Sequence, residues 1–204
     1  MHQLSKLFKL LELTRSQVQQ GYILSRVRKH ALSDLAQHQY LVSVIGWQLA
    51  RLAKRAGAKI DVEKVLELCL VHDLGELLGG DIGKYYAITN PRARKLAKAF
   101  ESENQRFLTQ FFGADSQRVA TLFREVMTKS TDEGKIMNIA DRMECAHYLT
   151  YLNNFERPDF DIAKSTLEIA RQLKDRKARQ TITAFIRTWS RDIKRKDHRK
   201  SELL

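Results

Sequence analysis

Five polar side chains occupy positions in predicted helices where apolar residues are expected, and their types suit metal binding. They are His38, His72, Asp73, Glu76 and Asp141. Burying even one ionised carboxylate without a partner is costly, and no lysine or arginine shares the helix faces on which these residues fall. A divalent cation is the simplest common partner, because imidazole and carboxylate together suit zinc, manganese, iron, cobalt or nickel. The residues therefore predict a metal site built from several helices.

The elements that must position these groups follow from the apolar periodicity, which is helical almost throughout the chain. Ser33 or Asp34, and the pair Asn90-Pro91, are good helix starts. The expected helices span residues 3–13, 34–56, 61–78, 91–112, 115–128, 133–153 and 160–193. No segment alternates as a strand does, so we expect an all-α fold.

Three of these helices direct the polar groups inward. His38 lies on the apolar face of the helix at 34–56, and Asp141 is the only charge on the inner face of the helix at 133–153. One face of the helix at 61–78 carries residues spaced i, i+3, i+4 and i+7, namely Cys69, His72, Asp73 and Glu76. Adjacent residues on a helix are about 100° apart, so His72 and Asp73 can both lean toward one ion.

The composition narrows the class of protein. The 204 residues fit a single domain of 1–204, and 43% of them are hydrophobic, which is too many for a disordered chain. No run of eighteen apolar residues occurs, so no membrane span is expected. The two cysteines favour a reducing, cytoplasmic compartment. The chain has 36 Lys+Arg and 24 Asp+Glu, which gives a net charge of +12. Such a charge favours binding to nucleic acid, a membrane surface or small anionic substrates.

The segments around the predicted site resemble the HD-domain metal-dependent phosphohydrolases. His38, Val71-His72-Asp73 and Ile139-Ala140-Asp141 match the H…HD…D pattern of that family. The finer pattern is similar to the branch that contains the 5′-deoxynucleotidases. It consists of LSDLAQHQYLVSVIGWQLA at 32–50, HDLGELLGGDIGK at 72–84 and KIMNIADRMECAHYL at 135–149. The resemblance covers about residues 19–153, which we expect to be the core, followed by the C-terminal helix and a basic tail at 194–204.

The resemblance implies a single-domain helical bundle around one central divalent metal ion (Mn, Co, Zn, Fe, Ni or Mg). Its ligands would be His38, His72, Asp73 and Asp141. Glu76 matches the catalytic acidic residue of the family, which takes a proton from the attacking water or orients that water. Asp81 matches the second acidic residue, which hydrogen-bonds a ribose hydroxyl or handles the leaving oxygen.

The same branch places a substrate-contacting arginine before the first metal histidine, and here the sequence departs from it. The best alignment puts Gln19 at that position, ahead of Gly21-Tyr22. The nearest cations are Arg26 and Arg28, and Lys84 follows the second acidic residue. We expect these three side chains to bind the substrate phosphate.

The function predicted from these features is hydrolysis of a phosphomonoester, with a nucleoside 5′-monophosphate as the small phosphorylated substrate. The excess of basic residues lies outside the middle third of the chain, which has no net charge and carries His72 and Asp73. This distribution favours attraction of a phosphate substrate over a nucleic-acid-binding surface. Members of the branch are often dimers, and the apolar face of the helix at 160–193 could pack against a second copy or serve the chain's own core.

Two alternatives stay open from the sequence. The first is an HD-type nuclease or cyclic-nucleotide phosphodiesterase using the same metal site, although aromatic residues are not interleaved with the basic run. The second is a non-catalytic nucleic-acid-binding or regulatory protein whose zinc is structural. Its ligands would be Cys69, His72, Cys145 and His147, although this spacing lacks a zinc-finger loop.

Overall fold

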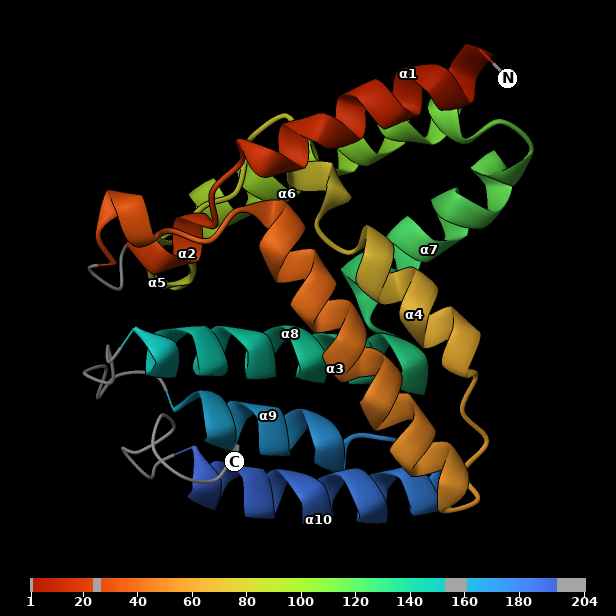
Figure 1. Cartoon of the computed structure of the whole chain (residues 1–204), viewed down its shortest axis with the longest axis vertical. Coiled ribbons are helices and arrows are strands. Elements are labelled where there is room, and N and C mark those ends of the chain that lie inside the picture. The colour runs from red at the N-terminus through yellow and green to blue at the C-terminus, as the bar shows by residue number, and fades with distance from the viewer. Residues whose placement is uncertain (1, 24–26, 153–160, 194–204) are drawn as a thin grey trace. The chain divides into compact units, whose positions relative to one another are not determined.

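The structure is a computed structural model that describes residues 2–23, 27–152 and 161–193. Every regular element in these ranges is a helix, as Figure 1 shows, so the all-α prediction is confirmed. One isolated antiparallel bridge joins Val18 to Asp34. None of the helices in the described ranges is long and apolar enough to cross a membrane.

The chain divides into two compact units, each made of two stretches of sequence. The first unit contains Met1–Tyr40 and Leu70–Met127, and the second contains Leu41–Cys69 and Thr128–Leu204. The boundaries fall within α3 (Leu35–Arg55) and α4 (Val62–Val71).

The first unit carries most of the short helices. Around α6 (Pro91–Thr109) pack α5 (Lys84–Thr89) and two 3-10 turns, η3 (Leu74–Glu76) and η4 (Gln110–Asp115), and η4 also contacts α1 (His2–Leu11). Its remaining elements are η1 (Glu12–Arg15), α2 (Gln20–Ile23), η2 (Lys29–Ala31) and α7 (Ser116–Thr128). As predicted, Asn90 caps α6, and its side chain accepts a hydrogen bond from the Ala93 amide at 3.0 Å.

The second unit contains a stack of three helices. In it α9 (Ile162–Arg171) contacts both α8 (Asp132–Tyr151) and α10 (Arg176–Asp192), as Figure 1 shows. Ile182 and Ile186 of α10 are fully buried. Of the two alternatives for the apolar face of this C-terminal segment, the structure therefore shows that it serves the chain's own core.

Three element predictions are corrected by the structure. The single helix expected at 160–193 is broken after α9, because the Asp132 carboxylate accepts the backbone amides of Lys174 and Asp175 at 2.8 and 2.7 Å. Asp175 then caps α10 by accepting the Ala178 amide at 2.9 Å. The helix expected over 61–78 ends at Val71. The segment 79–90, which lies between two expected helices and was not itself expected to be helical, contains the helix α5.

Gly46 allows α3, α4 and α8 to approach closely within the second unit. A Cβ atom at this position would lie 2.5 Å from Cys69 Sγ and 3.5 Å from Ala140 Cβ. We expect Gly46→Ala to destabilise the protein, because overpacking a filled core costs about 1–3 kcal/mol, whereas alanine gains only about 1 kcal/mol of helix propensity over glycine. The free energy of unfolding in urea measures the effect.

A double-mutant cycle with Cys69→Ala tests the cause. Removing the sulfur should make room for the added methyl group, so the double variant should be more stable than the sum of the single changes predicts. Gly21→Ala is the control, because a Cβ there meets no atom within 4 Å. Strict additivity in the cycle would show that the cost does not arise at Cys69.

Candidate metal centre

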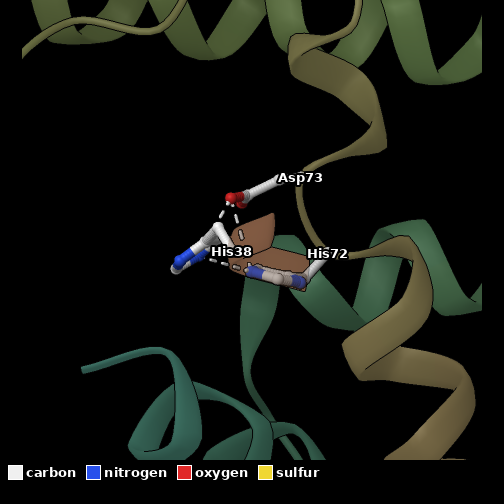
Figure 2. Close-up of side chains that lie close together, drawn as sticks. All are labelled: His38, His72 and Asp73. Atoms are coloured by element: carbon white, nitrogen blue, oxygen red, sulfur yellow. Dashed lines mark hydrogen bonds and ion pairs between the residues drawn. The ribbon is translucent and has the colours of Figure 1, made fainter. Parts of the chain in front are cut away.

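Three side chains of the first unit converge on one point (Figure 2). His38 Nε2 lies 3.3 Å from His72 Nε2 and 3.4 Å from Asp73 Oδ2, and His72 Nε2 lies 3.3 Å from the same carboxylate oxygen. His38 and His72 are 1% and 4% exposed. Two buried imidazole nitrogens and a carboxylate oxygen thus form a nearly equilateral triangle.

The dimensions of this triangle fit a first-row divalent cation. With these edges, its centre lies about 1.9 Å from each corner, and protein ligands bind such a cation at about 2.0–2.2 Å. An ion just outside the plane therefore reaches all three atoms. Protein hydrogen bonding alone accounts poorly for the arrangement, because two imidazole nitrogens face each other and share one acceptor oxygen. Both the donor set and its spacing fit a bound metal.

The local folding explains how these residues meet. Asp34 caps α3 through its Oδ1, which accepts the Gln37 amide at 2.8 Å, and His38 follows in the first turn of that helix. His72 and Asp73 come directly after α4, and Asp73 has φ −108° and ψ 7°, outside the helical region. The turn into η3 therefore positions His72 and Asp73. The sequence predicted a helix face for them, and that prediction is wrong.

Glu76 and Asp81 border a small cavity in the same unit. The cavity has a volume of about 40 Å³, and the residues that line it are Gln17, Val18, Gln20, Leu35, Glu76, Gly79, Gly80 and Asp81. A buried water needs only about 10–15 Å³ of such space, so the cavity has room for water but not for a nucleotide. Both predicted acidic residues thus lie beside a site that suits a water molecule.

The turn that joins these two acids is fixed by a residue of α6. Asn104, which is 5% exposed, donates hydrogen bonds from Nδ2 to the carbonyl oxygens of Gly75 at 2.8 Å and Gly79 at 3.3 Å. Gly80 has φ +101°, and a Cβ there would collide with the Phe100 ring, so this position requires glycine. Asn104 was missed in the sequence analysis. Its position could have indicated a buried polar contact, because Asn104 lies on the same helix face as the apolar residues Phe100 and Leu108.

Asp141, the fourth predicted ligand, belongs to the second unit, where it is half-buried on α8. Its Oδ1 lies 4.0 Å from Cys145 Sγ. Burial, and secondarily the negative charge of Asp141, raise the pKa of the Cys69 thiol to about 12. Without a bound metal, Cys69 is therefore a neutral thiol at physiological pH.

The raised pKa of Cys69 predicts selective labelling of the two cysteines. At pH 8 iodoacetamide should modify the half-buried Cys145 faster than the fully buried Cys69, because only an accessible thiolate reacts. Raising the pH to 9.5 should not unmask Cys69, since its pKa still lies well above that value. Mass spectrometry of the two peptides, with urea-unfolded protein as the control, measures the difference. Equal rates in the folded protein would contradict it.

Of the three predicted phosphate-binding residues, Arg28 alone has a side chain within the described part of the chain. Arg26 lies outside the described residues, and so does the Lys84 side chain, although Lys84 begins α5. Arg28 is exposed and does not line the cavity. Their roles remain predictions from the sequence.

The structural-zinc alternative is disfavoured by the contacts of its two histidines. Nε2 of His72 faces His38 and Asp73, and Nε2 of His147 accepts a hydrogen bond from the Trp189 indole at 2.9 Å. Both nitrogens are engaged elsewhere, so the Cys₂His₂ arrangement is not supported.

Comparison with solved structures identifies the class of fold. The chain superposes on a conserved hypothetical protein from Pyrococcus furiosus with a TM-score of 0.68 and 21% identity, over 93% of this chain and 98% of that one. The PH0347 protein from Pyrococcus horikoshii gives the same TM-score with 20% identity, over 91% and 98% of the two chains. The chain thus has the same overall fold as these two Pyrococcus proteins.

Residues 14–185 match the HD domain family. The chain belongs to this family, which confirms the resemblance drawn from His38, His72-Asp73 and Asp141. Members of the family bind divalent metals, in agreement with the triangle of donors.

Curated relatives are named as nucleotidases. The chain is 29% identical to a 5′-deoxynucleotidase of Vibrio vulnificus over 149 residues, which is 70% of this chain and 74% of that protein. It is 24% identical to a 5′-deoxynucleotidase of Vibrio cholerae over 165 residues, or 80% and 84% of the two chains. Family and relatives together support a phosphohydrolase.

Proposed function

We propose that the protein is a metal-dependent phosphomonoesterase that acts on nucleoside 5′-monophosphates, as a 5′-deoxynucleotidase does. The observation that carries the proposal is the triangle of His38, His72 and Asp73 donors in the same unit as a water-sized cavity bordered by Glu76 and Asp81. The nucleotidase names of the relatives support the choice of substrate. In keeping with the cysteine usage, we also propose a cytoplasmic location.

The metal would be held by His38, His72 and Asp73, with Asp141 as the proposed fourth ligand. When bound, such an ion polarises a phosphate oxygen and lowers the pKa of a coordinated water. Its positive charge would also balance the partly buried carboxylate of Asp73 beside the two buried histidines.

The chain's own residues supply the proton chemistry. We assign Glu76 to accept the proton of the attacking water, because this residue lines the cavity that has room for that water and its carboxylate can act as a general base. Asp81 borders the same cavity and is assigned either to the ribose hydroxyl or to the leaving oxygen. The nucleotide itself is too large for this cavity and has to bind outside it.

A panel of nucleoside 5′-monophosphates, with and without the 2′-hydroxyl, tests the proposal. Each is incubated with chelator-stripped protein and Mn²⁺, Co²⁺, Zn²⁺ or Mg²⁺, and released phosphate is measured. We expect metal-dependent release from at least one nucleotide and none in EDTA. Cleavage only of cyclic nucleotides or of single-stranded oligonucleotides would favour the diesterase or nuclease alternative. No cleavage of any of them by metal-loaded protein would overturn the proposal.

A further inference from the structure

We propose that Gln19 is a positioning residue of the metal centre, whose side-chain amide holds the Asp73 carboxylate in the orientation that metal binding needs. This inference rests on the proposed function, because it takes His38, His72 and Asp73 as metal ligands. It gives a role to a position where the sequence departs from the branch that it resembles.

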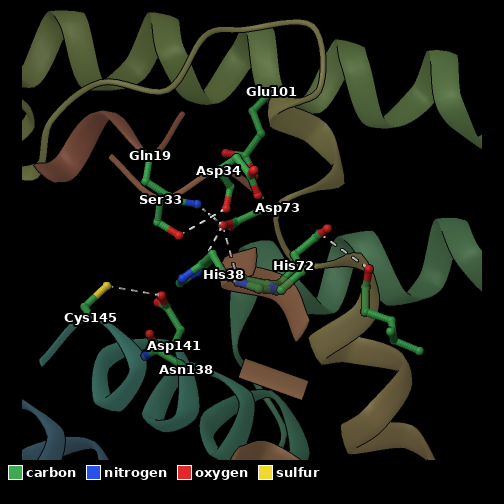
Figure 3. A network of polar contacts seen from close by, with 12 residues as sticks. Gln19, Ser33, Asp34, His38, His72, Asp73, Glu101, Asn138, Asp141 and Cys145 are labelled. Atoms are coloured by element: carbon green, nitrogen blue, oxygen red, sulfur yellow. Dashed lines mark hydrogen bonds and ion pairs between the residues drawn. The ribbon is translucent and has the colours of Figure 1, made fainter. Parts of the chain in front are cut away.

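The contact that carries the inference is direct. Gln19 Nε2 donates a hydrogen bond to Asp73 Oδ2 at 3.0 Å, as Figure 3 shows. This is the same oxygen that faces the Nε2 atoms of His38 and His72. A carboxylate only accepts hydrogen bonds, so the NH₂ end of the amide must face Asp73, and the orientation of the amide is fixed.

The backbone of Gln19 is itself held in place. Its amide donates to the Ser33 carbonyl at 3.0 Å, and the Leu35 amide donates to the Gln17 carbonyl at 2.9 Å. These bonds flank the bridge between Val18 and Asp34. The side chain of Gln19 therefore starts from a fixed point.

The same bridge joins the Gln19 segment to the start of the helix that supplies His38. Residues 33–35 lead directly into α3, whose first turn carries His38, and the His38 amide donates to the Asp34 carbonyl at 3.1 Å. Asp73 comes from the turn after α4, 35 residues further along the chain. Gln19 belongs to the segment that pairs with the start of α3, and it bonds to Asp73. It therefore fixes the Asp73 carboxylate relative to His38. Partners of this kind orient a ligand and raise its affinity for the metal.

The neutral charge of Gln19 suits this role. A glutamine orients the carboxylate without adding a positive charge, whereas an arginine there would place a cation within hydrogen-bond distance of the oxygen that faces the metal. Two like charges this close repel, so an arginine holding this carboxylate would weaken metal binding. We infer that Gln19 serves the metal ligand, and that phosphate recognition falls to other residues.

Metal affinity of two matched glutamine variants tests the inference. In Gln19→Met the side chain keeps its length but loses the donor. The control is Gln37→Met. Gln37 is exposed and adjacent to His38, and its side chain donates a hydrogen bond to Asp34 Oδ2 at 3.1 Å, which the substitution removes. Full-length, chelator-stripped protein is titrated with Mn²⁺ in a calorimeter. We expect the Kd to rise about 10-fold in Gln19→Met, within the 10–100-fold range known for such partners, and to stay unchanged in Gln37→Met.

Thermal unfolding separates positioning from a general loss of structure. Without metal, both variants should unfold at the wild-type Tm, and saturating Mn²⁺ should raise the Tm less in Gln19→Met. If Gln19→Met unfolds early even without metal, Gln19→Asn takes its place. Its amide is one methylene too short to reach Asp73, and the same loss of Mn²⁺ affinity is expected.

The outcomes distinguish this inference from the proposed function. Wild-type protein that binds none of the four divalent metals would overturn both. Wild-type protein that binds Mn²⁺ and hydrolyses nucleotides, alongside a Gln19→Met variant with wild-type Kd, would overturn the role of Gln19 alone. An equal rise of Kd in Gln37→Met would likewise overturn it, because the effect would then not depend on the bond to Asp73.

Discussion

Replacing Glu76 with glutamine is expected to lower kcat by about 10²–10⁴-fold, the range that general acid–base groups contribute, while leaving Mn²⁺ affinity unchanged. Glutamine has the same size and shape as glutamate but cannot accept a proton from water. Glu76 ends the 3-10 turn that begins after Asp73, and it borders the water-sized cavity. The described metal donors come from other residues, so the substitution separates proton transfer from metal binding.

The matched control is Glu103→Gln, the same chemical change at an exposed position of α6. Glu103 forms an ion pair with Arg106 at 2.7 Å on the surface, where such pairs contribute little. Its kcat and metal affinity should equal those of the wild type. If Glu76→Gln keeps wild-type kcat in the metal-loaded enzyme, another group must accept the proton, and Asp81, which borders the same cavity, becomes the candidate.

The sequence predicted the site because polar groups on apolar faces leave a local signal. Burying His38 and His72 beside the partly buried Asp73 has to be compensated, and this requirement is visible in the periodicity of each segment alone. His38, His72 and Asp73 converge, but not through the helix face that the periodicity predicts. That face would also include Cys69, whereas α4 ends at Val71 and Cys69 packs against Gly46 in the second unit.

The parts of the fold that the sequence did not predict depend on contacts between distant residues. The apolar spacing continues through Leu74 and Leu77, so nothing local indicates that α4 stops at Val71. The break between α9 and α10 contains neither glycine nor proline. It is stabilised by Asp132, which lies more than 40 residues earlier and accepts the amides of Lys174 and Asp175. Helix propensity depends on the local sequence, so it cannot predict a hydrogen-bond partner as distant as Asp132.

The functional contacts beyond the ligands were hidden for the same reason. The hydrogen bond from Gln19 to Asp73 joins residues 54 positions apart, and it depends on the pairing of residues 17–19 with 33–35. The bonds of Asn104 to Gly75 and Gly79 cross 29 and 25 positions. A polar residue on an apolar face shows that a partner exists, but only the folded chain shows which partner it is.

Asp141→Asn is expected to weaken Mn²⁺ binding by at least about 100-fold and to abolish hydrolysis. Partners that only orient a ligand already contribute about 10–100-fold, so loss of a direct carboxylate ligand should cost more. The fold should survive, because Asp141 is half-buried and asparagine has nearly the same shape. Calorimetric titration of stripped protein measures the affinity, and Asp73→Asn, which alters a donor of the observed triangle, sets the scale for a true ligand.

A second readout for Asp141→Asn comes from Cys69. The negative charge of Asp141 helps to raise the pKa of this thiol, so removing the charge should lower the pKa, although burial, the larger cause, remains. Cys69 should therefore become slightly more reactive toward iodoacetamide at pH 10 without becoming reactive at pH 8. The absence of reaction at pH 8 reports that Cys69 is still buried in a folded second unit, independently of any metal.

Asp115→Asn, at an exposed aspartate that ends η4, should leave Mn²⁺ affinity unchanged and controls for the loss of one negative charge. An Asp141→Asn variant that binds Mn²⁺ like the wild type, while Asp73→Asn does not, would show that the ion is held without Asp141. The H…HD…D pattern would then hold in this chain only for His38, His72 and Asp73. Equal losses in Asp73→Asn and Asp141→Asn, with Cys69 still unreactive at pH 8, would instead support Asp141 as the fourth ligand.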